Sequence, residues 1–396
     1  MLLTKFLLNI VLFNQTIYQN KIGVIKIKSL STFVVLALML LTNVGTAVLA
    51  QDSTASDTTY RNRVLFLPAV GASPETGFLF GAVAVPQFKV AHAGPETRSS
   101  SILISGIYTL KNQILTSFVP DIIFPLEKWI LSGNYFVNYY PENYWGVGPS
   151  TRKGDKLNVL YTQVNFEQTV LRQIKPGLFV GPYLRWSKLY HVKFENSDGD
   201  RVPAPDVRGN DGSTSAGIGF TIRWDERNSN MTPIRNHFME FSLLANPSFP
   251  GSSDPYTSYQ LDARKYFDLG KNQNSVFALQ GLFRFTTGHP PFRDMSLIGG
   301  DMINRGYYEG RFRDQNAGQV QVELRQHMFG RFGLTLFAAS GQVWDRFSEL
   351  TFANYKWTTG AGLRFDVNPQ DPTNLRIDFG LGRNTSGFYL QFGEAF

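Results

Sequence analysis

Residues 216–224 read Ala-Gly-Ile-Gly-Phe-Thr-Ile-Arg-Trp and divide into two faces by strict alternation. One face is apolar and ends in Trp224, whereas the other holds glycines, a threonine and Arg223. Successive side chains of a β-strand point to opposite sides, so a period of two predicts a strand with one apolar and one polar face.

The same alternation recurs along the chain, for example in 320–327, 361–367 and 375–381, and no segment shows a sustained helical stripe. We expect sixteen strands, an even number as bacterial outer-membrane barrels have. They are predicted near 64–71, 77–88, 100–110, 112–120, 129–139, 159–171, 177–190, 214–225, 237–246, 257–267, 275–286, 318–328, 333–344, 356–367, 374–382 and 387–396.

Three features favour a membrane barrel over a soluble sandwich. Consecutive polar faces carry Arg, Glu and Asp, which a wet lumen tolerates. Aromatic residues end several apolar faces, as membrane girdles require; they are Trp129, Tyr135, Tyr139, Tyr183 and Trp186. Backbone groups in lipid must all be paired, so such strands have to close. The predicted fold class is all-β: a transmembrane antiparallel β-barrel of about sixteen strands in the bacterial outer membrane.

The composition agrees with this interpretation and excludes others. Of 396 residues, 43% are hydrophobic, which excludes a disordered chain. The mean hydropathy of −0.15 excludes a protein of many membrane helices, each of which needs about 20 consecutive apolar residues. The net charge of +7 is dispersed over strands and loops, so we expect no nucleic-acid partner. The chain has no cysteine, which suits an exported protein.

The N-terminal segment has the order of a secretory signal. Basic residues precede an apolar run at 33–49, which ends in Val48-Leu49-Ala50. We expect a signal peptide at 1–50, a short periplasmic linker at 51–63 and the barrel domain at 64–396. An uncleaved membrane anchor is the alternative, although Thr42, Asn43, Gly45 and Thr46 interrupt the run.

Two predicted connections are long. Residues 190–213 are polar, as expected of an external loop. Residues 287–317 combine glycine, arginine and aromatic residues, including Arg305-Gly306-Tyr307. This mixture suits a loop that folds into the lumen better than a solvated one.

At this loop the sequence resembles the bacterial surface antigen superfamily of outer-membrane assembly and secretion barrels, which includes the barrel of the β-barrel assembly machinery subunit. In that family a loop between the eleventh and twelfth strands enters the barrel with an Arg-Gly-aromatic tip. Arg305, Gly306 and Tyr307 match the tip, and the loop falls between the same two strands here. The resemblance implies that Glu323 is the carboxylate partner of Arg305, as a buried lock.

Two further segments resemble family motifs. Asp225, Arg227 and Pro233 match a strand end and turn, with Asn236 where the family has a glycine. Residues 387–396 alternate, and the aromatic residues Phe392 and Phe396 resemble the C-terminal signal by which such barrels are themselves assembled.

Two departures from the family limit the inference. Ala339 stands where a second carboxylate for the loop arginine is common, so one acceptor is expected to be lost. The periplasmic transport-associated domains that precede such barrels have no counterpart between Ala50 and the first predicted strand. A separately encoded periplasmic protein is therefore a candidate partner, beside outer-membrane lipids and a polypeptide or lipid client.

The resemblance implies a role in outer-membrane biogenesis, by insertion or translocation of protein or lipid. A passive porin-like channel and a structural or adhesive barrel remain the alternatives. We expect no enzyme, because the five scattered histidines show no spacing to a nucleophile. No metal or cofactor is expected either, since metal-ligand spacings and a phosphate loop are missing from the sequence.

Overall fold

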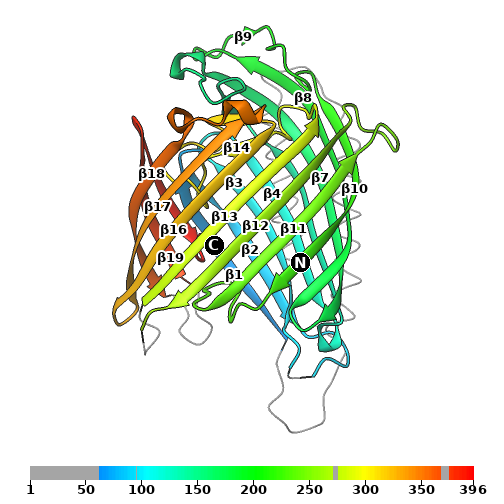
Figure 1. Ribbon diagram of the computed structural model, residues 1–396, viewed down its shortest axis with the longest axis vertical. Helices are drawn as coiled ribbons and strands as arrows, with labels where there is room; N and C mark the ends of the chain where they lie inside the picture. The colour runs from blue at the N-terminus through cyan, green and yellow to red at the C-terminus, as the bar shows by residue number, and fades with distance from the viewer. Residues whose placement is uncertain (1–61, 95, 271–274, 367–373) are drawn as a thin grey trace, which may run out of the picture. The chain divides into compact units, whose positions relative to one another are not determined.

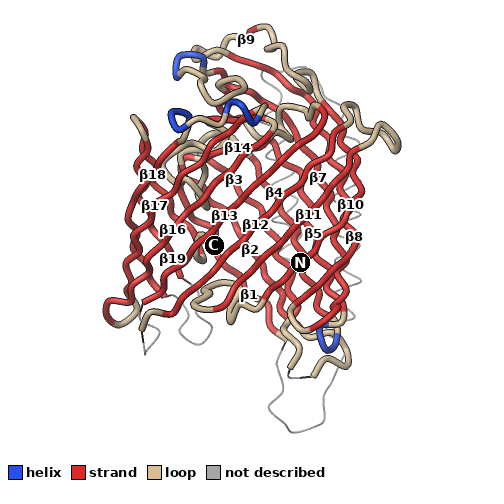
Figure 2. The backbone as a smooth tube through the Cα atoms, in the orientation of Figure 1, coloured by secondary structure: helices blue, strands red, loops and turns tan. Residues whose placement is uncertain are grey.

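The computed structural model describes residues 62–94, 96–270, 275–366 and 374–396. In this part of the chain, sixteen long antiparallel strands close into a barrel (Figure 1). Strands make up almost the whole wall, and loops gather at its two ends (Figure 2). The predicted signal peptide and residues 51–61 of the predicted linker lie outside the described residues.

The wall strands of the first half are β1 (Arg63–Ser73), β2 (Gly77–Phe88), β3 (Ser100–Thr109), β4 (Ile114–Ile123), β5 (Trp129–Tyr139), β7 (Leu157–Lys175), β8 (Leu178–Glu195) and β10 (Ser213–Asp225). Those of the second half are β11 (Asn236–Asn246), β12 (Tyr256–Asp268), β13 (Ser275–Gly288), β16 (Asn316–Phe329), β17 (Phe332–Trp344), β18 (Lys356–Asp366), β19 (Asn374–Gly382) and β20 (Thr385–Phe392). Each of the sixteen predicted strands has a counterpart in the wall, and the sixteen-stranded barrel is confirmed.

The connections hold only short elements. They are the strands β6 (Glu142–Tyr144), β9 (Arg201–Val202), β14 (Ser296–Ile298) and β15 (Phe312–Asp314), and the 3-10 turns η1 (Pro125–Glu127), η2 (Lys153–Asp155), η3 (Phe347–Glu349) and η4 (Phe352–Asn354). None of the helical segments in the described ranges has the length and hydrophobicity to span a membrane. Long connections lie at one end of the barrel, the long-loop end, and mostly short turns lie at the other, the short-turn end.

The wall is inverted relative to a soluble protein, as β16 illustrates. Val320 and Val322 are 48% and 38% exposed on the outer face. The alternate residues Gln321 and Glu323 are only 2% and 0% exposed. Apolar residues face outward and polar residues inward, which is stable only where the outside is lipid.

Aromatic residues lie on the outer face, as predicted for Trp129 and Trp186, both exposed. Tyr135 packs between Phe118 and Phe166 of the neighbouring strands, with ring centroids 5.8 and 4.7 Å away. The prediction for Tyr183 is wrong. It lies three positions before Trp186, an odd number, so the two side chains point to opposite sides of the strand, and Tyr183 lines an interior cavity.

The barrel closes between its first and last strands at a weak seam. β1 pairs with β2 along its whole length, from Arg63 with Gln87 to Ser73 with Gly77. With β20 it shares, among the described residues, a single register pair, Ala72 with Leu390. Few backbone hydrogen bonds therefore hold the seam.

The predicted last strand, 387–396, is wrong at its end. β20 stops at Phe392, because Gly393 adopts a φ of +82°, a left-handed conformation that glycine accepts without cost. Phe392 stays on the wall and is exposed, whereas Phe396 is buried against Tyr266, with ring centroids 6.1 Å apart. Residues 393–396 thus form a C-terminal tail that leaves the wall.

The inverted pattern predicts how the outer face responds to charge. Val322→Arg places a guanidinium at the middle of β16 and should destabilise the barrel by about 2–4 kcal/mol. Phe329→Arg, at the exposed end of the same strand, should cost about 0–1 kcal/mol. Urea unfolding in lipid vesicles measures both variants, and equal effects would contradict a lipid-facing wall.

Candidate functional site

The candidate site lies at the tip of the loop between β13 and β16, which carries the β14–β15 hairpin. The tip is a tight turn, in which the Tyr307 N–H donates to the Asn304 carbonyl at 3.2 Å. Asn304 and Gly306 both have positive φ, 53° and 115°. A side chain at Gly306 would meet the backbone of Leu381, since its Cβ would lie 2.9 Å from the Leu381 carbonyl carbon. Glycine therefore lets the loop lie directly on β19.

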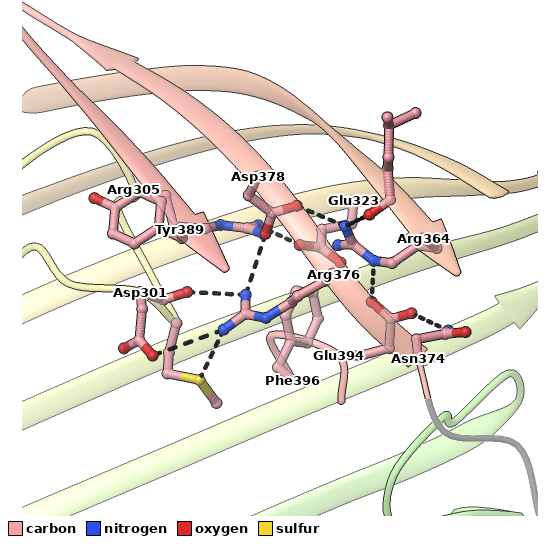
Figure 3. Close-up of polar contacts among 12 residues, drawn as sticks. Asp301, Arg305, Glu323, Arg364, Asn374, Arg376, Asp378, Tyr389, Glu394 and Phe396 are labelled. Atoms are coloured by element: carbon pink, nitrogen blue, oxygen red, sulfur yellow. Dashed lines mark hydrogen bonds and ion pairs between the residues drawn. The ribbon is translucent and has the colours of Figure 1, made fainter. Parts of the chain in front are cut away.

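Arg305 is fully buried at this tip. Figure 3 shows its side chain beside those of Asp378 and Glu323. Its Nη2 forms an ion pair with Glu323 on β16, and its Nη1 lies 2.5 Å from Asp378 Oδ2 on β19. The guanidinium also stacks on Phe337 of β17, 3.7 Å from the ring centroid. Because β16 and β19 are separated by two strands, these contacts hold the tip against the inner face of the wall. We call Arg305, Glu323 and Asp378 the lock.

Other arginines share the lock's carboxylates. Asp378 also accepts from Arg364 at 2.5 Å and from Arg376 at 3.2 Å. Glu323 accepts from Arg325 Nε at 2.8 Å. Each buried carboxylate therefore faces more than one guanidinium, and the charges offset one another as a network.

Asp378 resolves the first departure from the family. Ala339 lies on β17 and offers no carboxylate, but Asp378 reaches Arg305 from β19 instead. Alternation alone places Asp378 on a polar inward face. That it meets Arg305 depends on the barrel's curvature, which brings strands far apart in sequence to one loop.

The C-terminal tail joins the same network. Glu394 accepts from Arg364 Nε at 2.8 Å and lies 3.7 Å from Arg325 Nε. Arg325 also donates to the main-chain oxygen of Phe396 at 2.9 Å, and its guanidinium lies over the Phe396 ring. The two residues predicted as an assembly signal therefore lie on different sides of the wall: Phe392 faces outward, and Phe396 is buried in the interior.

The loop tip is also bonded to the β19–β20 hairpin. The Gly306 N–H donates to the Tyr389 hydroxyl at 2.8 Å, and the Thr385 hydroxyl donates to the Gly306 carbonyl at 3.0 Å. The hydroxyl of Tyr307 accepts from the Arg383 N–H at 3.1 Å. All three tip residues predicted from the sequence thus contact the last two strands or the wall.

The second predicted motif forms a turn at the short-turn end. Arg227 donates two hydrogen bonds to Asp225, each 2.9 Å long. The Pro233 carbonyl accepts from Arg325 at 3.4 Å, which links the turn to the charge network. Asn236 has a φ of +71°, so asparagine fills the left-handed position where the family has glycine.

The loop between β13 and β16 also carries carboxyl groups with raised pKa values, toward the long-loop end of the barrel. Burial raises the pKa of Glu309 to about 7 against the opposing effect of Arg293, and the carboxylates of Glu75, Asp301 and Glu142 raise it further. The Glu309 N–H also donates to Glu75 at 2.7 Å, so the two residues are adjacent.

Asp314 has the same tendency. Burial raises its pKa to about 6, the hydrogen bond from the Gln315 N–H lowers it, and the carboxylates of Asp345 and Glu349 raise it further.

Among the described residues, no group of His, Asp and Glu side chains is arranged to hold a metal ion.

The lock predicts that Arg305→Ala releases the loop. Removing one partner of a buried pair typically costs about 3–5 kcal/mol, because the remaining charges are left bare. Protease added at the long-loop end should then cleave the loop, while Arg346→Ala, at a highly exposed arginine, should leave it protected. Unchanged protection in Arg305→Ala would count against the lock.

The raised pKa values predict that the part of the loop that carries Glu309 and Asp314 docks more tightly against the barrel interior in acid. A carboxyl with a raised pKa binds its proton more tightly when docked than when released, where its pKa is about 4. Docking should be strongest below that value and weaken as the pH rises through about 6 and 7.

Spin labels at Met302→Cys and Phe352→Cys would report this change as a distance, because the native chain has no cysteine. The distance distribution should broaden between pH 5 and pH 8.5, and Glu309→Gln should remove much of that change. Identical distributions at both pH values would contradict the assignment.

Comparisons with known proteins identify the family and the fold of the barrel. Residues 100–396 match the Omp85 superfamily domain. No curated protein sequence is significantly similar to the chain.

Among solved structures, BamA from Haemophilus ducreyi lacking POTRA domains 1–3 is similar, with a TM-score of 0.56 and 14% identity over 84% of this chain and 70% of that one. CdiB from Acinetobacter baumannii has a TM-score of 0.51 and 14% identity, over 83% and 59% of the two chains. CdiB from Escherichia coli has a TM-score of 0.54 and 9% identity, over 84% and 68%. These likenesses show a shared barrel fold. Since the domain match extends over most of the sequence, the chain belongs to the Omp85 superfamily.

Proposed function

We propose that this barrel acts in outer-membrane biogenesis or secretion, by inserting or translocating a polypeptide or lipid through its β1–β20 seam. The observation that carries the proposal is the seam itself, where β1 and β20 share one register pair. A strand edge with unpaired backbone groups is a template for pairing with another strand. An incoming client strand could therefore bind where the seam opens.

The lock is placed to control this opening. Gly306, next to Arg305 in the loop tip, is hydrogen-bonded to Tyr389 of β20 and to Thr385 at the start of the same strand. Leu390, the seam residue, is the neighbour of Tyr389 in sequence. Movement of the loop would therefore be transmitted to the strand that forms one side of the seam.

The remaining assignments follow from this role. We place the protein in the outer membrane of a Gram-negative bacterium, with residues 1–50 as its export signal and outer-membrane lipids around the wall. Catalysis is not part of the mechanism, because strand pairing and transfer of a client need no bond to break. A separately encoded periplasmic protein is the partner that would deliver the client.

The proposal predicts that closing the seam stops function. Ala72→Cys with Leu390→Cys pairs two cysteines across the seam. In cells depleted of the wild-type protein, this variant should fail to restore the level of folded outer-membrane proteins until a reductant is added. The matched control, Ile377→Cys with Leu390→Cys, bridges the same Leu390 to β19 instead and should remain active.

Mass spectrometry of the purified variants establishes that each disulfide has formed. Full activity of the oxidised seam variant would refute transfer through the seam. Loss of activity in both oxidised variants would show that a bridge at Leu390 is harmful wherever it leads, which also contradicts the proposal.

A further inference from the structure

A polar chamber lies inside the barrel, away from the lock. Its volume is about 480 Å³, a size that suits a small-molecule site. The wall strands β5, β7, β8 and β10–β13 line it with hydroxyl, amide and charged groups.

The charges of the chamber are mostly held in pairs. Arg185 lies 2.5 Å from Asp294, and Arg223 lies 2.6 Å from Glu240. Arg284 lines the chamber as well, and its charge acts at longer range on Asp294. The chamber therefore offers a polar surface with hydrogen-bond donors, acceptors and the cationic group of Arg284.

A second hollow, the vestibule, lies at the long-loop end and has a volume of about 610 Å³. Its lining comes from the connection before β7, the loop between β13 and β16 and the connection between β17 and β18. It is acidic, with Asp314, Asp345 and Glu349 on its surface.

Met295 is the residue that lines both hollows. The side chains of both sequence neighbours are hydrogen-bonded to other parts of the barrel. The preceding Asp294 accepts from Ser215 at 2.6 Å and from Tyr256 at 2.9 Å, and the Ser296 hydroxyl donates to the Gln315 carbonyl at 2.9 Å. Met295 lies between these two residues, and its unbranched, flexible thioether side chain can change rotamer without moving the backbone.

We propose that the vestibule and the chamber are two parts of one route for small hydrophilic solutes and ions, and that the Met295 side chain closes it. The chamber extends toward the short-turn end, where Thr221 and Glu240 line it close to the ends of β10 and β11. On the opposite side of the lumen, the lock network fills the space with buried charge pairs. Solute passage and strand transfer thus use different parts of the same barrel.

Conductance of the full-length protein in planar bilayers tests the route. Met295→Ala should raise the ion conductance severalfold because it removes the side chain between the two hollows. Leu297→Ala is the matched control, since Leu297 lines the chamber alone and lies two residues away. It should leave the conductance near the wild-type value.

A thiol at the same position adds a second readout. The native chain has no cysteine, so Met295→Cys gives one reactive site. A cationic methanethiosulfonate reagent added to the vestibule side should lower the conductance of this variant and leave the wild type unchanged.

Three results would overturn the route. Met295→Ala could conduct like the wild type, or the modified Met295→Cys could conduct like the unmodified variant. The rise in Met295→Ala could also accompany loss of the loop's protease protection, with Arg305→Ala conducting equally well. In that case release of the whole loop, and not the Met295 side chain, would open the barrel. The seam disulfide should leave the conductance of Met295→Ala unaltered, so this test is separate from that of the proposed function.

Discussion

The buried Arg305 guanidinium is the constraint on which the interior of this barrel depends. It bonds Glu323 on β16 and Asp378 on β19, and it stacks on Phe337 of β17 between them. A bare charge in this position would cost several kcal/mol, so the loop tip and three wall strands have to keep one arrangement. The other arginines extend this arrangement to the C-terminal tail through Glu394.

The inverted wall makes such a network possible. The apolar outer faces contact lipid, so the polar residues face one another inside the barrel and can form hydrogen bonds and ion pairs there. The same inversion leaves room for a polar chamber on the side that the lock does not fill. The lock network therefore occupies one side of the interior, and the polar chamber occupies the other.

The sequence predicts much of this fold because period-two alternation is local. Each strand, and the position of the Arg305 loop between the eleventh and twelfth, can be found without knowing the rest. Contacts between distant strands are not local, so Asp378 as the second acceptor was not predicted. Phe396 was predicted on a strand because its alternation continues past Gly393, whose left-handed backbone ends β20. Met295 carries no local signal, since its role depends on two hollows that exist only in the closed barrel.

A double-mutant cycle of Arg305→Ala and Asp378→Ala tests the central claim most directly, with urea unfolding in vesicles as the readout. Residues that share one ion-pair network show coupling energies of about 0.5–3 kcal/mol. The lock predicts that the double variant is less destabilised than the sum of the two single variants by an amount in that range. Additive losses would contradict the account, because they would mean that Arg305 and Asp378 stabilise the barrel independently.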